Sequence, residues 1–576
     1  MTDTGFPVDV YTPHGYLANP FAVAHSWSEG EGGCLRTSRE YVGMGWQFPW
    51  ALRAQASVDL IVTLESGDER LVTRADFDRA GLVSPHHSAN LFVYRWEAFG
   101  QSWDASFMLI DEERLGVELE WSPLPDTTVD PASAPIRLTI GLVGWRSGSD
   151  GATLTVTSPE SATDFSQPYA VVDLGEPYGN FRLWGDNAWI ARPGMPRERG
   201  GPVRVPGARP APWLAQVPGG VAVAWSLDLH LTDWRQGVCG VVRRMRTADS
   251  PWVSESVARI VGTAMSRARA EDDEFWDGAT RLEGDWPDSW RRGWVYDTET
   301  TRMCVYPPGG IFTDVWPAWM VQWPRAVIAE NTLDMARFAY ASPDLAQRAL
   351  LSLFRDAEAP NVPCVFQHGE PNMVARDGSV CGTSPAWCVP FYNLERSFSF
   401  TLDSAWLAAI YPHLRAYLDW WLAERTDAEG WAVYKCTWEA GEDDTPRLDP
   451  ERRGDNVVSA FVRPVELQAT MALSAGVLAR FATVLGLPDD RQRWQAVEAD
   501  YLNRTRQLWD EDAGRFRDWD ARNGRFLAPA PERPNYWGID PCRYSALAFT
   551  PLLAGLTDEA YRAGLRRELQ QYAGPP

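Results

Sequence analysis

A run of acidic residues from Thr437 to Arg447 carries the side chains best suited to chemistry. It reads Thr-Trp-Glu-Ala-Gly-Glu-Asp-Asp-Thr-Pro-Arg, with four carboxyl groups in six positions. Carboxyl groups crowded in a partly apolar pocket repel one another and lose solvation, so we expect at least one to keep its proton near neutral pH. A protonated carboxyl can donate to a leaving-group oxygen. On composition alone, the run is more typical of a solvated surface loop.

The order of these residues resembles the acid-bearing segment of inverting glycosidases in glycoside hydrolase family 63 and of their trehalase-like relatives. Glu439, Gly441, Asp443, Pro446 and Arg447 match its pattern Glu-x-Gly-x-Asp-x-x-Pro-Arg. The resemblance implies that Asp443 is the general acid. It implies that Glu439 positions a sugar hydroxyl or tunes Asp443, and that Arg447 contacts substrate or anchors the loop. A purely structural role stays open for Glu439.

Three further stretches are similar to the same family. They are Gly382–Trp387, Tyr411–Trp421 and Pro551–Gly555, which resemble its Lys-Pro-Pro-x-x-x-Trp, Tyr-Pro-x-Leu-x-x-x-x-x-Trp-Trp and Pro-Leu-Leu-Ala-Gly segments. The similar stretches lie in the family's order between about residues 310 and 560. The resemblance therefore implies inverting hydrolysis of an α-linked oligosaccharide or α-glycoside, in the manner of an α-glucosidase.

Tryptophans are the candidates for sugar contacts. Trp316, Trp319 and Trp323 follow one another at spacings of three and four, which predicts one helical face, available either for stacking on sugar or for core packing. The resemblance favours Trp316 and Trp387 as residues of the cleft. Trp438, inside the acidic run, is a further candidate.

One position departs from the family. Relatives often carry an aspartate that grips sugar hydroxyls where this chain has Met320. We therefore expect Asp314 to substitute for it from elsewhere in the loop, or the subsite to prefer another sugar.

Composition limits the partners. The chain has 576 residues, 30 of them tryptophan, and a formal net charge of −23. Such a charge repels nucleic acids and anionic membranes, so a neutral carbohydrate is the expected partner and neither nucleic acid nor membrane is. Indole faces suit sugar surfaces, although most tryptophans should pack in the core. The sequence does not predict the oligomeric state.

The N-terminus and the cysteines indicate the compartment. No basic and apolar leader follows Met1, and the eight cysteines form no C-x-x-C pair, which together predict reduced thiols in a cytoplasmic protein. His86 and His87 lack a third ligand at a suitable spacing, so no metal site is expected there. The sequence predicts no cofactor and leaves a structural calcium ion open.

Residues 1–245 are predicted to form an N-terminal antiparallel β-sandwich. Apolar residues there recur with a period of two between clusters of Gly, Pro, Asp and Ser. The expected strands are Ala56–Leu64, Asn90–Ala98, Ser106–Ile110, Arg114–Trp121, Ile136–Trp145, Ala152–Thr157 and Gly220–Leu231. The Pro- and Arg-rich segment Pro193–Pro212 is expected to be a long loop within this domain.

The period then becomes helical. A linker region, residues 246–287, contains a helix over Ser254–Trp276, and residues 288–576 read as paired helices. The expected helices are Ser289–Cys304, Pro324–Ala341, Pro343–Phe354, Pro385–Phe398, Leu402–Arg425, Val462–Leu485, Arg491–Trp509, Tyr544–Leu556 and Asp558–Tyr572. This pattern predicts a multidomain β plus α protein whose catalytic domain is an (α/α)6 toroid.

The sequence predicts that this toroid is incomplete. Only about nine helical segments follow residue 288, where closure needs twelve, and the family's late glutamate, its catalytic base, has no counterpart. We expect the base to lie C-terminal to Pro576 or to be another carboxylate. Two alternatives stay open: an (α/α)6 phosphorylase, which needs no base, and a carbohydrate-binding protein that has lost hydrolysis.

Overall fold

The computed structural model describes residues 34–38, 40–48, 56–88, 91–111, 114–125, 135–146, 155–157, 170–173, 180–186, 209–210, 220–229, 236–245, 257–306, 308–319, 325–442, 448, 458–527 and 549–572. The chain divides into two compact units. The first runs from Met1 to Met303, and the second takes most of the chain from Cys304 to Pro576. The domain bounds inferred from the sequence, at residues 245 and 288, stay a prediction.

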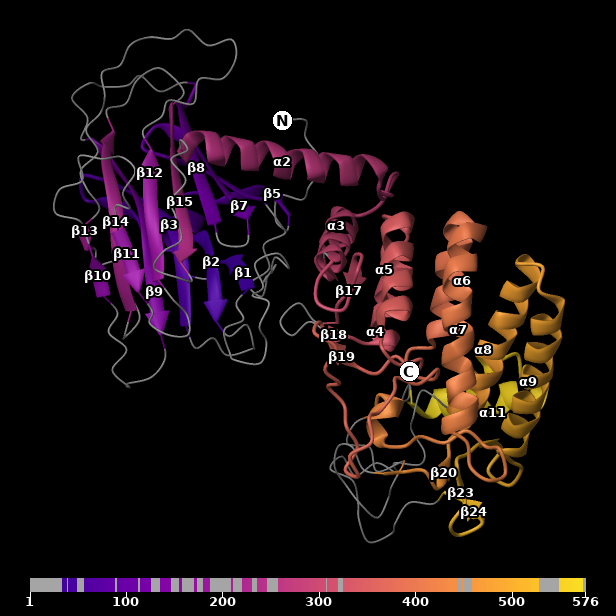
Figure 1. Cartoon of the computed structure of the whole chain (residues 1–576). Coiled ribbons are helices and arrows are strands. Elements are labelled where there is room, and N and C mark those ends of the chain that lie inside the picture. The colour runs from indigo at the N-terminus through magenta and orange to yellow at the C-terminus, as the bar shows by residue number, and fades with distance from the viewer. Residues whose placement is uncertain are drawn as a thin grey trace. The chain divides into compact units, whose positions relative to one another are not determined.

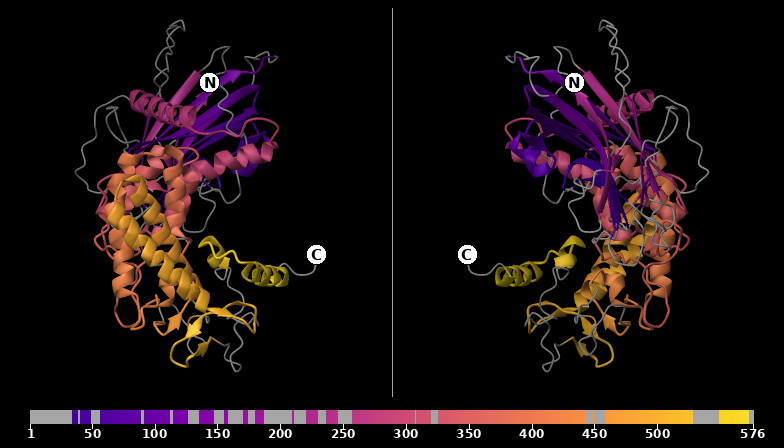
Figure 2. Two further views of the ribbon diagram at one scale, coloured as in Figure 1. Left: turned by 90° about the vertical axis from the view of Figure 1, so that its right-hand side faces the viewer. Right: turned by 90° about the vertical axis from the view of Figure 1, so that its left-hand side faces the viewer.

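The first unit contains two antiparallel sheets (Figure 1 and Figure 2). One has the strand order β1-β2-β3-β9-β14-β13, with β4 paired to β3, and the other has the order β10-β11-β12-β15-β8-β7-β6-β5. The strands of the first sheet are β1 (Cys34–Thr37), β2 (Val42–Phe48), β3 (Ala56–Ser66), β4 (Glu69–Leu71), β9 (Ile136–Arg146), β13 (Arg209–Pro210) and β14 (Gly220–Leu229). Those of the second are β5 (Val83–His87), β6 (Leu91–Ala98), β7 (Gln101–Asp111), β8 (Arg114–Pro123), β10 (Thr155–Thr157), β11 (Ala170–Asp173), β12 (Asn180–Asp186) and β15 (Gln236–Met245). Every predicted strand is confirmed over its described residues, and of the predicted loop Pro193–Pro212 only residues 209–210 are described.

The inner faces of the two sheets meet through large apolar side chains. The ring of Trp46 on β2 lies 5.4 Å from that of Phe181 on β12, and both residues are buried. Within the first sheet, β2 and β3 also approach closely, because a Cβ on Gly45 would lie 2.1 Å from the carbonyl oxygen of Val58. Alternation of apolar residues thus places one face of each strand in a shared core.

Helix α2 (Val257–Gly278) covers part of the second sheet (Figure 1). Its apolar stripe packs on strands β6, β7 and β15 through Val257, Ile260, Val261, Ala264, Met265 and Ala268. These residues recur at steps of three and one, as an amphipathic helix requires. The predicted linker helix is therefore confirmed over the described residues.

A buried ion network joins α2 and α3 (Asp288–Met303) to strand β5. Asp272 accepts from His86 Nε2 at 2.8 Å and from Arg302 at 3.0 Å, while Trp276 donates to Glu299 at 2.6 Å. Burial raises the pKa of Glu299. Burial also acts to raise the pKa of Asp272, but the hydrogen bond from His86 and the charge of Arg302 lower it below its usual value. Removing one partner would leave a buried charge uncompensated. His86 therefore has a structural carboxylate partner.

The second unit is built from helices (Figure 1). They are α4 (Ile328–Phe338), α5 (Pro343–Asp356), α6 (Pro390–Thr401), α7 (Ser404–Glu424), α8 (Val465–Val484), α9 (Pro488–Gln507), α10 (Thr550–Leu553) and α11 (Glu559–Tyr572). Helix α4 packs on α6, and α6 packs on α8; α5 packs on α7. Trp494 of α9 donates to Tyr411 of α7 at 3.2 Å. The helices therefore form two neighbouring rows, α4-α6-α8 and α5-α7-α9.

Local sequence explains where these helices start and which side they bury. Proline stands in the first turn of α5, α6 and α9, where its missing N–H costs nothing. The apolar stripe of α7, with Trp406, Leu414 and Trp421 among its members, is buried throughout. Helix α8 is long and apolar enough to cross a membrane, but 78% of its most apolar window is buried inside the protein, as in a core helix.

Candidate active site

The part of the loop between α3 and α4 that the structure describes is extended rather than helical. Trp316 belongs to strand β17 (Trp316–Pro317), which pairs with β16 (Val305–Tyr306), and Trp319 forms a bridge with Arg325. The prediction that the tryptophans of this loop share one helical face is therefore wrong for these two. Pro317 lacks the N–H that a helix needs, and strand pairing satisfies its neighbours instead. Trp323 lies outside the described residues.

Trp316 is packed inside the loop. Its side chain has no exposed surface, and its ring stacks on Phe312 with 4.2 Å between centroids. In this arrangement no face of the indole is available to a sugar.

Asp314 is held by an ion pair. Arg348 donates to its two oxygens at 2.6 and 3.2 Å, and this pairing lowers the pKa of Asp314. The carboxylate thus orders the loop against α5, and a grip on sugar hydroxyls stays a prediction.

Three of the predicted sugar-binding tryptophans come together. Trp319, Trp387 and Trp438 are each half-buried and pack against one apolar cluster. The cluster consists of Val327, Ala329, Cys364, Met373, Ala375, Cys381 and Cys436. Loops that are far apart in the sequence therefore present partly exposed indoles around one centre, which is the arrangement that sugar binding requires.

Gly441 links the acidic run to this centre. Its φ is +71°, and a Cβ there would lie 2.6 Å from Cγ, Cδ1 and Nε1 of Trp387. A side chain would collide with the pyrrole face of the indole, so only glycine allows the backbone to lie on that face. The segment that the sequence singled out thus contacts Trp387 at Gly441.

Glu439 is a structural anchor. Its side chain is fully buried and accepts from Arg425 Nε and Nη2 at 2.9–3.1 Å, from the Gly382 N–H at 2.9 Å and from the Lys435 N–H at 2.7 Å. Burial raises the pKa of Glu439, and these donors work against that rise. All of its donors come from the protein, which agrees with the structural reading left open by the sequence.

Glu330 is a carboxyl that sequence reasoning missed. It lies in the first turn of α4, and one of its oxygens, Oε2, is buried with no hydrogen-bond partner among the described residues. Burial raises its pKa to about 7; Asp334 adds to the rise, and hydrogen bonds from its own N–H and from the Trp387 side chain oppose it. A carboxyl that titrates near neutrality can give or take a proton.

Backbone strain lies next to Trp387. Cys388 and Val389 both have positive φ, of 56° and 47°, just before α6 begins at Pro390. Such a conformation costs roughly 1–3 kcal/mol per residue and is rare for a β-branched side chain. This strain delays the start of α6 beyond the predicted Pro385 and holds Trp387 in the loop.

Glu330 and Trp387 share their surroundings with a thiol. Burial, then Glu330 and Asp334, raise the pKa of Cys388 to about 12, which leaves this thiol protonated and unreactive near neutrality. Among the described residues no group of three or more His, Cys, Asp and Glu side chains could hold a metal ion. The described side chains at this centre offer carboxyl groups and aromatic faces.

A sequence signal for Glu330 did exist. Glu330 and Asp334 are one helical turn apart in an amphipathic segment, directly after the tryptophan-rich loop. Two carboxyls on the inward side of a helix are unusual unless they have a role. Asp443 and Arg447 lie outside the described residues, so their roles stay predictions.

Residues 319–575 match the family model described as a mannosylglycerate hydrolase MGH1-like glycoside hydrolase domain. Among curated proteins, none matches the chain. This match confirms the resemblance to glycoside hydrolases that the sequence motifs indicated, and the chain is a glycosidase.

Solved structures give weaker likenesses. A family 63 mannosylglycerate hydrolase from Thermus thermophilus, in complex with Tris, is 17% identical over 49% of this chain and 77% of its own, with a TM-score of 0.37. A family 92 inverting mannosidase from Bacteroides thetaiotaomicron is 12% identical over 94% of this chain and 70% of its own, with a TM-score of 0.41.

Proposed function

Because residues 319–575 match a glycoside hydrolase domain, we propose that this glycosidase cleaves an α-linked glycoside with inversion and uses Asp443 as general acid. The proposal rests on one observation above all. Trp319, Trp387 and Trp438 pack against one cluster, and Gly441 of the acidic run lies on the face of Trp387.

In this proposal the two rows of helices belong to an (α/α)6 toroid, and the two sheets form a β-sandwich. The alternation of packing along α4-α6-α8 and α5-α7-α9 supports the toroid. The contact of Trp46 with Phe181 supports the sandwich.

The mechanism requires two carboxyl groups on opposite faces of the sugar. Asp443 would protonate the glycosidic oxygen while a second carboxylate removes a proton from the attacking water, and inverting enzymes hold the two about 6.5–9.5 Å apart. We assign Glu330 to the second position. A pKa near 7 suits a general base, because it is ionised in a large fraction of molecules at neutral pH and still attracts a proton.

The Trp387 indole neighbours both segments of the proposed site. Its side chain lowers the pKa of Glu330 by hydrogen bonding, and its pyrrole face lies against Gly441. Asp443 follows Gly441 by two residues. These contacts support the pairing of Asp443 with Glu330.

The substrate class is tested by offering full-length protein aryl α-glucoside, aryl α-mannoside and α-mannosylglycerate, with the anomer of the first product recorded by NMR. We expect release of the β-anomer from at least one of them. Release of the α-anomer would reject inversion. Release of a sugar phosphate only when phosphate is present would favour the phosphorylase alternative.

The two carboxyls are distinguished with an α-glycosyl fluoride, whose leaving group needs no protonation. Asp443→Asn should lose at least about 100-fold in kcat on the glycoside and keep most activity on the fluoride. Glu330→Gln should lose activity on both substrates, because water still needs a base. If Asp443→Asn folds and keeps full glycoside turnover, the assignment of the acid is wrong.

A further inference from the structure

We propose that Arg325 is a positioning residue of the candidate active site, one that orients the Trp319 indole for the sugar and stabilises the ionised form of Glu330. The inference rests on the proposed function, in which Trp319 contacts sugar and Glu330 is the base. None of the family motifs above includes Arg325, which lies between these two residues in the chain. Its role therefore follows from contacts in the folded protein.

The guanidinium of Arg325 lies on the indole of Trp319. Its central carbon is 4.1 Å from the centroid of the ring, which is well within the range of a cation–π contact. The backbone makes a second link, because the Trp319 N–H donates to the Arg325 carbonyl at 2.8 Å. Trp319 packs in turn against the cluster that it shares with Trp387 and Trp438. The main chain and the side chain of one residue therefore both fix this indole at the shared cluster.

Arg325 is itself firmly held. It begins strand β18 (Arg325–Ala326), which pairs with β19 (Val365–Phe366), and only 9% of its surface is exposed. Helix α4 begins three residues later, at Ile328. A side chain that is buried on a paired strand loses little further freedom when a substrate binds. The strand and the start of the helix thus keep Arg325 and Glu330 in a fixed arrangement.

A cation and an anion act on Glu330 within the part of the chain that the structure describes. Burial raises the pKa of Glu330 to about 7 and the charge of Asp334 adds to the rise, whereas the charge of Arg325 opposes it. The neighbouring thiol of Cys388 stays protonated, because burial, Glu330 and Asp334 raise its pKa to about 12. Without Arg325, a larger fraction of Glu330 would carry a proton at neutral pH. A protonated carboxyl cannot take a proton from water, so Arg325 keeps the base in its active form.

Arginine suits both tasks better than lysine does. A guanidinium is planar, stacks on aromatic faces and stays charged, whereas an ammonium group carries the charge without a flat face. The two tasks can therefore be separated by substitution. Arg325→Lys keeps the charge near Glu330 and weakens the stacking, whereas Arg325→Gln keeps a planar group and removes the charge.

The charge is tested first without substrate, by urea denaturation of the full chain from about pH 4 to about pH 9. The parent, Arg325→Gln and Asp334→Asn are each compared with the same protein carrying Glu330→Gln, so that the difference reports Glu330 alone. The folded-state pKa exceeds the unfolded value of 4.5, so ionisation of Glu330 removes stability between 4.5 and about 7, and the loss levels off above. We expect this levelling-off at higher pH in Arg325→Gln and at lower pH in Asp334→Asn. An unchanged position in Arg325→Gln would overturn the proposal.

Kinetics on a glycoside that the parent hydrolyses test the orientation of Trp319. Arg325→Lys should raise KM about fivefold, as expected for a weakened cation–π contact, and should leave the acid limb of the kcat/KM profile in place. Arg325→Gln should move that limb to higher pH. If Arg325→Gln does not fold, Arg325→Lys decides the proposal through KM. A folded Arg325→Lys with the KM of the parent would reject the role of Arg325.

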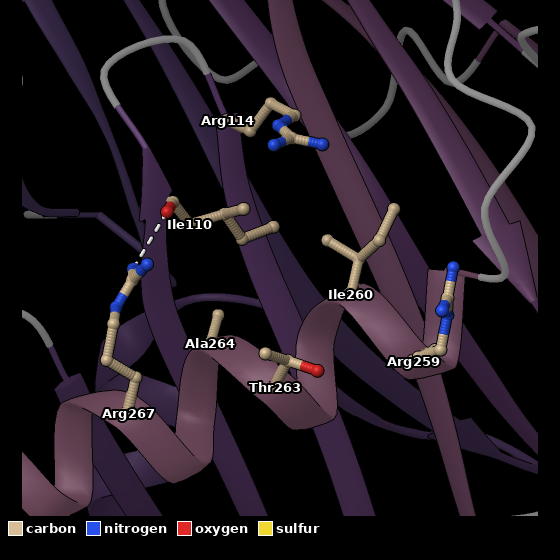
Figure 3. Close-up of a pocket in the computed structure, with 7 residues that line it drawn as sticks. All are labelled: Ile110, Arg114, Arg259, Ile260, Thr263, Ala264 and Arg267. Atoms are coloured by element: carbon tan, nitrogen blue, oxygen red, sulfur yellow. Dashed lines mark hydrogen bonds between the residues drawn. The ribbon is translucent and has the colours of Figure 1, made fainter.

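Arg267 supplies the matched control. Figure 3 shows this arginine on α2, where it donates to the backbone carbonyl of Ile110 at 2.8 Å beside a cavity of the first unit. Arg267→Lys and Arg267→Gln weaken a comparable link between segments, but Arg267 is no part of the candidate site, so KM and the acid limb should match the parent. Changes as large as those in the Arg325 variants would show that the effect is not specific and would reject the proposal.

The two experiments also separate this inference from the proposed function. A parent that hydrolyses no α-glycoside would contradict the proposed function, and the denaturation series would still decide whether Arg325 stabilises the ionised form of Glu330. A parent that hydrolyses the glycoside, with Arg325 variants that behave like it, would keep the proposed function and overturn the inference.

Discussion

Glu439 is a fully buried glutamate and Glu330 is a half-buried one, and their surroundings are opposite. Burial raises the pKa of both. Glu439 meets the guanidinium of Arg425 and two backbone N–H groups, whereas Glu330 has one oxygen, Oε2, to which no described residue donates a hydrogen bond. Burial alone therefore does not decide the role of a carboxyl. The number of donors around it separates an internal anchor from a group that is free to exchange a proton.

The two glutamates also differ in how they are identified. The family resemblance selects Glu439, and only the tertiary structure reveals Glu330. Glu439 is part of the matched motif, and the structure uses it to hold the acidic run against Gly382 and Arg425. Glu330 is outside any matched motif, and it acquires its properties from burial beside Trp387 and Asp334. The motif thus contains the residue that anchors it, whereas the raised pKa of Glu330 results from tertiary packing.

The largest expected effect removes the partner of Glu439. Arg425→Met leaves a buried carboxyl without its cation and should lower the free energy of unfolding by about 3–5 kcal/mol at neutral pH. The loss should shrink as the pH falls, because Glu439 can then take up a proton. Urea denaturation at several pH values measures this, with Arg425→Lys as the control that keeps the charge. A loss below about 1 kcal/mol would contradict the anchor role.

Next in size is the pH dependence that Glu330 contributes. Its pKa is about 7 in the folded protein and 4.5 in the unfolded chain, so the native state binds more protons between those values and stability falls as the pH rises through them. Glu330→Gln should match the parent below pH 4.5 and exceed it by up to about 3 kcal/mol above pH 7. Urea denaturation across this range measures the difference, with exposed Glu511→Gln as control. A constant difference would show that Glu330 does not titrate there.

A smaller effect tests the contact between Gly441 and the Trp387 indole. Gly441 and Gly378 both have positive φ, but a Cβ on Gly378 meets nothing within 4 Å, whereas on Gly441 it collides with Trp387. Gly378→Ala should cost about 1 kcal/mol from backbone strain alone. Gly441→Ala should cost about 2 kcal/mol and also lower kcat, because it displaces the indole. Equal losses in stability and activity would argue against the Trp387 contact.

The smallest effect concerns the hydrogen bond to Glu330. That bond from Trp387 lowers the pKa of Glu330, so Trp387→Phe should raise it further. The acid limb of the pH profile of kcat/KM should therefore move to higher pH while the fold is kept. A limb that does not move would indicate that another group controls the profile.

Several features of the fold followed from local pattern. The stripe of α7 and the apolar steps of α2 predicted helices because the repeat of buried side chains matches the helical period. The loop after α3 shows the limit of this reasoning. Spacings of three and four also suit a helix, but Pro317 and pairing with β16 decided for extended structure. A short spacing pattern does not specify which backbone partner will be present.

The residues of the candidate site likewise divide into those that the sequence predicted and those that it missed. The resemblance singled out Trp387, Trp438 and the glycine before Asp443, since it depends on residues that are close in the chain. Arg425 and Glu330 were missed because their roles depend on neighbours 14 and 57 residues away, respectively the Glu439 carboxylate and the Trp387 indole.

The sequence by itself determined that this chain is a glycosidase with strands first and helices after, because residue types and periods persist whatever their surroundings. Only the tertiary structure decided that Glu439 is an anchor, that Trp316 packs inside its loop, and that Glu330 titrates near neutrality. Those properties depend on desolvation and on the donors within hydrogen-bond reach. Both are set by which distant segments meet, and the composition of a segment does not contain that information.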